Sequence, residues 1–201
     1  WGKLRAGPVD YMLHPGWAMD VGLKGGPHGF GNLAPYVQHS SNPRDYAAWT
    51  AEQFDNSVTW NDIEWLRQTW RGNLVLKGIL NVEDARQAVA VGSDGIIVSN
   101  HGGRQLDGVA STAEMLPAIA DAVGSETTIL VDGGIRSGQD IVRALALGAR
   151  AVLIGRPWAL ALAAAGEAGL SRMLELMKQD MRTALGLTGV QTAHAVTRNT
   201  L

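Results

Sequence analysis

From about Asn73 onward, short runs of β-branched and other apolar residues alternate with helical patterns. The runs lack the polar alternation of half-exposed strands, which is typical of parallel strands buried on both faces. They predict four strands, at 74–79, 95–100, 128–132 and 151–155. Helices are predicted at about 82–91, 111–123, 137–147 and 157–185, with Gly92, Gly124 and Gly148 where the first three should end.

Four successive strand–helix units imply a parallel α/β architecture, either an open doubly wound sheet or part of a barrel. The positions of candidate functional residues distinguish the open sheet from the barrel. Lys77, Ser99, Asp132 and Gly155 fall at or just past the carboxyl ends of the predicted strands. In a barrel these ends converge on one face, whereas an open sheet spreads them along a crevice. We therefore expect a (β/α)8 TIM barrel, of which this chain supplies four units and a partner half the rest.

Residues 1–50 differ in composition and pattern: they are rich in Gly, Pro, His and Trp and show no sustained hydrophobic periodicity. This composition predicts a long loop or insertion with short helices. Residues 51–201 are expected to form the half-barrel. Trp1 is not an initiator methionine and no signal pattern follows it, so we expect the sequence to begin inside a longer protein. No apolar run approaches the roughly eighteen residues of a membrane-spanning helix.

Six of the seven tryptophans lie within the first seventy residues. We expect Trp65 and Trp70 to pack a helix that precedes Leu74. Trp1 and Trp17 are candidates for a membrane-surface patch, together with Lys3, Arg5, Met12, Leu13 and Lys24. An active-site lid or a subunit contact is an equal alternative for this patch.

Composition narrows the classes of function. The 201 residues carry a net charge of -2, which gives no electrostatic argument for nucleic-acid binding. The chain has no cysteine, which excludes disulfides, thiolate nucleophiles and Cys-ligated metals and permits a cytoplasmic location. His14, His28 and His39 lack metal-ligand spacing, so no metal site is expected. Residues 29–34 fit Gly-x-Gly-x-x-Ala but follow no strand, and we reject a dinucleotide site there.

The segment SNHGGRQLD, residues 99–107, directly follows the second predicted strand. It presents His101 and Arg104 three residues apart, with two glycines between them. A histidine has a pKa suited to abstracting a proton near neutral pH, and an arginine offers a planar fork for a carboxylate. The sequence thus predicts a site that binds the carboxylate of an acid and removes a proton from the neighbouring carbon. A surface ion pair of Arg104 is the weaker alternative, because the motif lies at a strand end.

Two further glycine and arginine segments follow the last two strands. The loop DGGIRSG contains Asp132, Gly133, Gly134 and Arg136, and Gly155 with Arg156 follows the fourth strand. Barrels often bind phosphate in the loops after strands seven and eight, so the four strands would be the last four of eight. Lys77, at the end of the first strand, is a candidate Schiff-base nucleophile, phosphate contact or stabiliser of an anionic cofactor ring, unless it only extends out of the barrel mouth.

Residues from about 55 to 187 closely resemble the FMN-dependent 2-hydroxy-acid oxidase and dehydrogenase family. The motifs SNHGGRQLDG, VDGGIRSGQDIVRALALGA and LIGR carry the resemblance. The stretch HPGWAMDVGL, residues 14–23, is most similar to the bacterial membrane-associated L-lactate dehydrogenases of the family, and to mandelate dehydrogenase next.

The resemblance implies a role for each of these residues. His101 would be the base and Arg104 the ligand of the substrate carboxylate. Lys77 would face the flavin N1 and C2 carbonyl, and Ser99 would also touch the flavin. The ribityl and phosphate path of FMN would be lined by Asp132, Gly133, Gly134, Arg136, Gly155 and Arg156. The family's substrate tyrosines, second substrate arginine and histidine-paired aspartate belong to the first barrel half and cannot be assigned here.

The expected function is oxidation of a small (S)-2-hydroxy acid, L-lactate to pyruvate first, with electrons passed to a quinone. (S)-mandelate oxidation and an oxygen-using oxidase are alternatives, and Gly103 modestly favours the dehydrogenases. Two alternatives lie outside this flavin chemistry: a flavin-free phosphate-binding barrel enzyme, and a non-catalytic fragment that only completes a partner half. We also expect a homo-oligomer in the cytoplasm, with peripheral contact to the inner face of the cell membrane as an option.

Overall fold

The computed structural model describes residues 8–25, 30–37 and 42–200. The chain divides into two compact units, Trp1–Ser57 and Val58–Leu201. Trp1, Lys3, Arg5, His28 and His39 lie outside the described residues. In the described ranges, no helix combines the length and the apolar character needed to cross a membrane.

The first unit contains short helices. They are α1 (Pro8–Leu13), α2 (Pro15–Trp17), the π-helix η1 (Ala18–Leu23) and α3 (Pro43–Gln53). The side chain of Asn42 accepts a hydrogen bond from the Arg44 N–H and so caps α3. Tyr46 on α3 is buried, with its ring 5.2 Å from that of Phe30. Aromatic contacts therefore join α3 to the segment 30–37.

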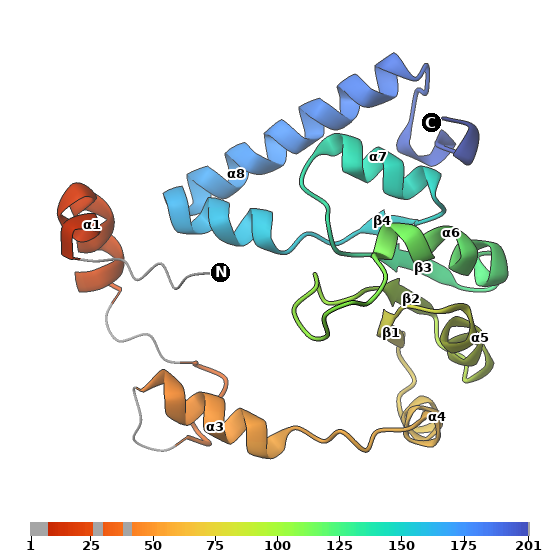
Figure 1. Cartoon of the computed structure of the whole chain (residues 1–201), viewed down its shortest axis with the longest axis horizontal. Helices are drawn as coiled ribbons and strands as arrows, with labels where there is room; N and C mark the ends of the chain where they lie inside the picture. The colour runs from red at the N-terminus through yellow and green to blue at the C-terminus, as the bar shows by residue number, and fades with distance from the viewer. Residues whose placement is uncertain (1–7, 26–29, 38–41, 201) are drawn as a thin grey trace. The chain divides into compact units, whose positions relative to one another are not determined.

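The second unit begins with a helix and continues as strand–helix units (Figure 1). Its elements are α4 (Trp60–Thr69), β1 (Val75–Ile79), α5 (Val82–Ala90), β2 (Gly95–Val98), α6 (Thr112–Val123), β3 (Thr128–Val131), α7 (Gly138–Ala146), β4 (Ala151–Val152), α8 (Arg156–Leu187), η2 (Ala193–Ala195) and η3 (Arg198–Thr200). Side chains cap the first turns of the helices between strands: Asn81 for α5, Ser111 for α6 and Ser137 for α7.

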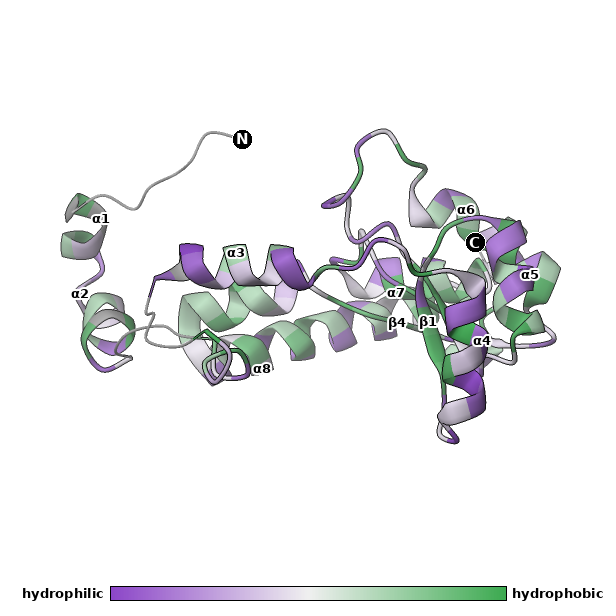
Figure 2. Cartoon of the chain, turned by 90° about the horizontal axis from the view of Figure 1, so that it is seen from below, coloured by the Kyte–Doolittle hydropathy of each residue, from purple (hydrophilic) through white to green (hydrophobic). Residues whose placement is uncertain are grey.

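The four strands form one parallel sheet in the order β1-β2-β3-β4. This consecutive order confirms the expected parallel α/β architecture. Within the described sheet, the strand order does not reverse as it does in a doubly wound sheet. Right-handed crossovers that all step the same way place their helices on the same face of the sheet. In Figure 2 the helix α5 carries both hydrophobic and hydrophilic residues, and its buried residues are Ala85 and Ala88.

The core lies between the sheet and these helices. The largest side chains with almost no exposure are Ile96, Val98, Leu116, Ile119, Val123 and Val142. Ile96 and Val98 come from β2, the central strand with all four residues buried, and Leu116, Ile119 and Val123 come from α6. The opposite side of the sheet is less covered, since Val75 on β1 is 44% exposed.

Three details differ from the sequence expectations. The fourth strand was predicted over 151–155, but β4 ends at Val152. Its partner β3 ends at Val131, opposite Val152, so Leu153 makes one last bond, from its N–H to the Val131 carbonyl, before the chain turns at Gly155 into α8. α8 is not one continuous helix, because Ala165 and Gly166 have non-helical backbone angles, and φ of Gly166 is +57°.

The predicted packing by Trp65 and Trp70 is wrong. Their side chains are 64% and 54% exposed, and only Trp60 of α4 packs against the core. The helix is instead held by Arg67, which forms an ion pair with Asp94 at 2.9 Å and also donates to the carbonyl of Trp70. Polar contacts at the amino end of the sheet therefore fix α4.

Candidate active site

The carboxyl ends of the first three strands meet through polar side chains. Lys77 of β1 forms an ion pair with Asp132, which follows β3, at 2.7 Å. The same ammonium donates to the hydroxyl of Ser99, which follows β2, at 2.8 Å. The structure thus brings together three of the residues that the strand-end pattern singled out.

A bulge in β1 lies at Lys77. The register with β2 shifts between Lys77 and Ile79, and Gly78 has a φ of +98°. Bulges next to functional sites redirect side chains out of the regular pleat. This irregularity accompanies the contacts of Lys77 with Ser99 and Asp132.

The loop after β2 carries His101 and Arg104, both exposed. Three consecutive residues, His101, Gly102 and Gly103, have positive φ angles of 57°, 66° and 70°. Glycine adopts this conformation freely, whereas a positive φ is uncommon for a histidine. The turn is held by a bond from the Gly103 N–H to the Asn100 carbonyl, at 3.0 Å.

The beginning of α8 reaches the same loop. The guanidinium of Arg156 donates to the carbonyl of Gly102 at 2.9 Å. A side chain that follows the fourth strand therefore touches the loop that follows the second. All four strand ends are linked, directly or through this loop.

Asn100 was missed in the sequence analysis. Its amide nitrogen donates to the carbonyl of Ala110 at 3.4 Å and so bridges the two ends of the loop. Its oxygen and the Thr112 hydroxyl would lie 3.3 and 3.2 Å from a Cβ at Gly133, whose φ is +89°. The positive φ and these close neighbours both favour glycine at position 133, where its loop packs against Asn100 and the start of α6. The signal available in the sequence was only an amide residue beside the histidine.

Two carboxylates occupy the amino end of α7. Asp140 accepts bonds from the N–H groups of Arg136 and Ser137, both at 3.1 Å. Asp180, from α8, accepts a bond from the N–H of Gln139 at 3.0 Å. Because an anion would have to displace these carboxylates, the amino end of α7 is a poor phosphate site.

The amino end of α8 is different. Gly155 is its N-cap and supplies no side-chain cap, and a Cβ at this position would meet nothing within 4 Å. Helix amino ends of this kind present backbone N–H groups to an anion. With the cation of Arg156 next to it, this end of α8 has the chemistry of a phosphate site.

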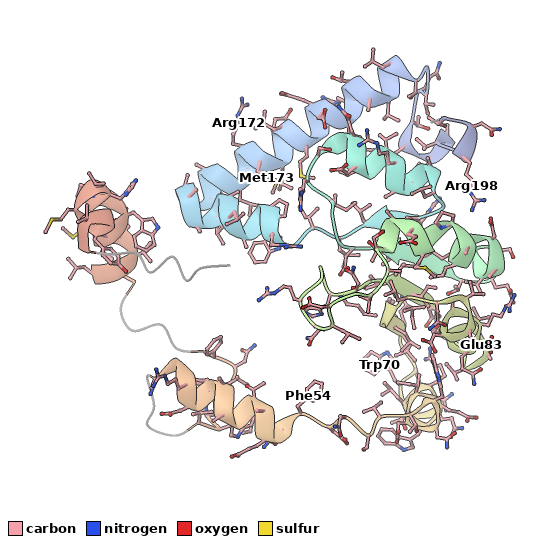
Figure 3. The ribbon with its side chains drawn as sticks, viewed as in Figure 1. Phe54, Trp70, Glu83, Arg172, Met173 and Arg198 are labelled. Atoms are coloured by element: carbon pink, nitrogen blue, oxygen red, sulfur yellow. The ribbon has the colours of Figure 1, made fainter. Side chains whose placement is uncertain are left out.

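Arg136 lies in other surroundings. It lines a pocket of about 370 Å³ between α7 and α8, whose other lining residues are Ser137, Gly169, Arg172, Met173, Leu176, Met177 and Asp180. In Figure 3, Met173 points from α8 toward α7 and Arg172 points away from it. Arg156 does not line this pocket, so the two arginines are not brought together there.

The donors and acceptors at the strand ends suit a flavin mononucleotide. Asp132 keeps one buried carboxylate oxygen without a hydrogen-bond partner, which suits the hydroxyl groups of a ribityl chain. A Cβ at Gly134 would also meet nothing, which leaves room beside the backbone. Within residues 8–25, 30–37 and 42–200, no three His, Cys, Asp or Glu side chains gather in a group able to hold a metal ion.

Comparison with known proteins identifies relatives over nearly the whole sequence. Residues 4–201 match the family of FMN-dependent dehydrogenases. The L-lactate dehydrogenase of Azorhizobium caulinodans is 53% identical over 201 residues, 98% of this chain and 53% of the relative. That of Caulobacter vibrioides is 54% identical over 193 residues, 96% of this chain and 50% of the relative. The chain thus spans about half the length of the curated relatives it matches.

Solved structures of mandelate oxidase are also similar. One with benzoyl-formic acid has a TM-score of 0.68 and 53% identity, and covers 70% of this chain and 42% of the other. A variant with a monooxide FMN adduct has a TM-score of 0.67 and the same identity, and covers 70% of this chain and 45% of the other.

Proposed function

Because the chain belongs to the FMN-dependent dehydrogenase family, we propose that it forms the carboxyl-terminal half of an enzyme that oxidises a small (S)-2-hydroxy acid, L-lactate to pyruvate. The observation that carries the proposal is the meeting of Lys77, Ser99 and Asp132 at the ends of three strands, beside the loop of His101. The 53% identity to an L-lactate dehydrogenase favours lactate among the acids. The similarity to mandelate oxidase keeps (S)-mandelate as the second candidate.

The four strands are the last four of a (β/α)8 barrel in this proposal. Their consecutive parallel order and the partial match to mandelate oxidase support it. The incompletely covered side of the sheet, where Val75 is exposed, would face the barrel interior. The half-barrel of this proposal is residues 51–201, of which Val58–Leu201 form the second compact unit, and residues 1–50 would be an insertion before it. The missing half would contribute further substrate-binding groups, so turnover requires the complete protein.

The substrate would be held and deprotonated by the loop after β2. Arg104 binds its carboxylate through two parallel N–H groups, which fixes the hydroxy-bearing carbon. His101 accepts a proton from the substrate, and FMN, when bound, supplies the two-electron acceptor. Arg156 donates a hydrogen bond to the Gly102 carbonyl and so restricts the loop next to His101.

Lys77, Ser99 and Asp132 would lie along the flavin. Lys77 has three ammonium protons, of which two are directed to Ser99 and Asp132, so a third is left for the flavin N1 and C2 carbonyl. The unpaired oxygen of Asp132 would accept from a ribityl hydroxyl. Phosphate would bind Gly155 and Arg156, with Gly133, Gly134 and Arg136 on the other side of the path.

The experiment is an anaerobic reduction panel on the complete protein with (S)-lactate, glycolate and (S)-mandelate. We expect a yellow protein whose flavin absorption bleaches fastest with (S)-lactate. A colourless protein with bound phosphate would instead favour the flavin-free rival. His101→Asn is the matched variant, expected to stay yellow and to be reduced roughly 10²- to 10⁴-fold more slowly. Rapid reduction of this variant would remove His101 as the base.

The finer part of the proposal concerns the electron acceptor and location. We place the protein in the cytoplasm, as a homo-oligomer in peripheral contact with the inner face of the membrane, with a membrane quinone as acceptor. The support is the exposure of apolar side chains on α1, α2 and η1: Val9, Tyr11, Met12, Leu13, Trp17, Met19 and Leu23. Sedimentation with anionic vesicles tests it, and a protein that stays in the supernatant and reduces only oxygen would contradict it.

A further inference from the structure

Ser99 has an unusual set of hydrogen-bond partners. Its side chain is buried, with 3% of the residue exposed, directly after β2. Its hydroxyl oxygen accepts one bond from the ammonium of Lys77, at 2.8 Å, and one from the backbone N–H of His101, at 3.1 Å. One oxygen atom thus joins a charged side chain on β1 to the backbone of the loop after β2.

The bond to His101 lies at a strained position. Among the described residues, His101 is the one non-glycine residue with a positive φ angle, +57°. A side chain with a Cβ resists this conformation, and such strain persists only where neighbouring contacts impose it. A serine hydroxyl that accepts an N–H two residues along the chain is a known way to hold such a turn.

The hydroxyl is itself fixed. Lys77 is bound to Asp132 at 2.7 Å, so its ammonium cannot move away from Ser99 without breaking an ion pair. A free serine hydroxyl would rotate, whereas one held by an ammonium keeps its oxygen in place. Ends of β1, β2 and β3 therefore determine where the backbone of His101 lies.

We propose that Ser99 is a positioning residue for His101, which it holds in the left-handed turn so that the imidazole is presented to the substrate. The proposal rests on the proposed role of His101 as the base. It differs from a role of Ser99 as a flavin contact alone, because it predicts a change in the loop even where no flavin is involved.

The chain offers a matched control at the other end of β2. Ser93 precedes β2, is also buried, with 8% of the residue exposed, and its hydroxyl has no hydrogen-bond partner. Ser99→Ala and Ser93→Ala each remove one buried hydroxyl, at opposite ends of β2. Ser99→Thr retains the hydroxyl and serves as the conservative variant.

The first measurement is steady-state turnover of (S)-lactate by the complete, FMN-loaded protein. We expect Ser99→Ala to lower kcat roughly 10- to 100-fold, because a misplaced base loses its alignment, with KM changed less than about two-fold. Ser99→Thr should recover most of kcat, and Ser93→Ala should match the wild type. Unchanged kcat in Ser99→Ala, or equal losses in Ser99→Ala and Ser99→Thr, would overturn the proposal.

The second measurement is amide hydrogen exchange of the peptide 100–110 in the same proteins, with and without FMN. Loss of the Ser99 acceptor should speed exchange of this peptide by about five-fold or more in Ser99→Ala, in both forms, and leave Ser93→Ala unchanged. Identical exchange in Ser99→Ala and wild type would overturn the anchoring. If the wild type oxidised no 2-hydroxy acid, the proposed function would fail, while the exchange comparison would still decide whether Ser99 anchors His101.

Discussion

At the scale of single residues, the exposed arginine of the loop after β2 is the group whose chemistry is most specific. A guanidinium makes two parallel N–H bonds to a carboxylate, whereas the lysine ammonium is a point charge on a flexible stem. Arg104 and Lys77 are therefore not interchangeable in the proposed site. The difference can be measured at Arg104.

Arg104→Lys should lower kcat/KM for (S)-lactate roughly 10- to 100-fold, because one charge-assisted hydrogen bond to the carboxylate is lost. Most of the change should appear in KM, with bound FMN unaffected. Arg150→Lys is the control, since this exposed arginine precedes β4 at the other end of the sheet. Steady-state kinetics that gave equal parameters for Arg104→Lys and wild type would contradict carboxylate binding.

The sequence predicted some of the contacts among the candidate site residues and not others. Lys77, Ser99 and Asp132 were predictable because polar residues at the carboxyl ends of buried parallel strands must lie near one another. The bond between Ser99 and His101 was not predictable, because it depends on the positive φ of a histidine. The pocket that Arg136 lines was also not predicted, since spacing does not tell which side of a loop a long side chain takes.

At the scale of elements, α7 and α8 approach each other at a glycine. A Cβ at Gly138 would lie 2.0 Å from the Met181 nitrogen and 2.3 Å from the Met177 carbonyl oxygen. These are backbone atoms of another helix, which cannot move aside without shifting α8. Any side chain at this position should separate the two helices.

Gly138→Ala should lower the free energy of unfolding by about 2 kcal/mol or more through this overlap. Gly186→Ala is the matched control, because this glycine is also helical and a Cβ there would meet nothing within 4 Å. It should leave stability unchanged or raise it by up to about 1 kcal/mol. Urea unfolding of the complete protein measures both, and equal midpoints for the two variants would refute the close approach.

Asp140 gives α7 a pH-dependent cap. Burial raises the pKa of its carboxyl, but hydrogen bonds from Ser137 and the Arg136 N–H, and then Arg143, outweigh burial and leave the pKa below the usual aspartate value. A lowered pKa in the folded protein stabilises it above the unfolded value, near pH 4, and this contribution is lost as pH falls through the lowered value.

The wild type should therefore be more stable than Asp140→Asn at pH 7, and the difference should shrink as the pH falls below about 4. Urea midpoints between pH 7 and pH 2.5 measure it. A difference that stays constant over this range, or that grows in acid, would mean that the ionised carboxylate does not support the cap.

Element positions were largely predictable, and their ends were not. Strands and helices followed from apolar runs. Ser137, the N-cap of α7, and Gly148, which follows its C-cap, lie where the sequence predicted the ends of this helix. β4 proved shorter than its apolar run because its partner β3 ends at Val131, which pairs with Val152. The break in α8 at Gly166 has a weak signal, since a glycine inside a long helical pattern is often tolerated.

At the scale of the whole molecule, the chain matches about half of each L-lactate dehydrogenase compared with it. The proposed enzyme therefore depends on a second set of four strands, which would complete the barrel and enclose the cofactor. The central claim is that the ends of β1 to β4 surround one flavin.

A crystal structure of the complete protein with FMN tests this claim most directly. We expect the ammonium of Lys77 at hydrogen-bond distance from the flavin ring, the phosphate at Gly155 and Arg156, and the imidazole of His101 over the substrate side of the ring. FMN bound away from these strand ends, or His101 directed away from the flavin, would contradict the account.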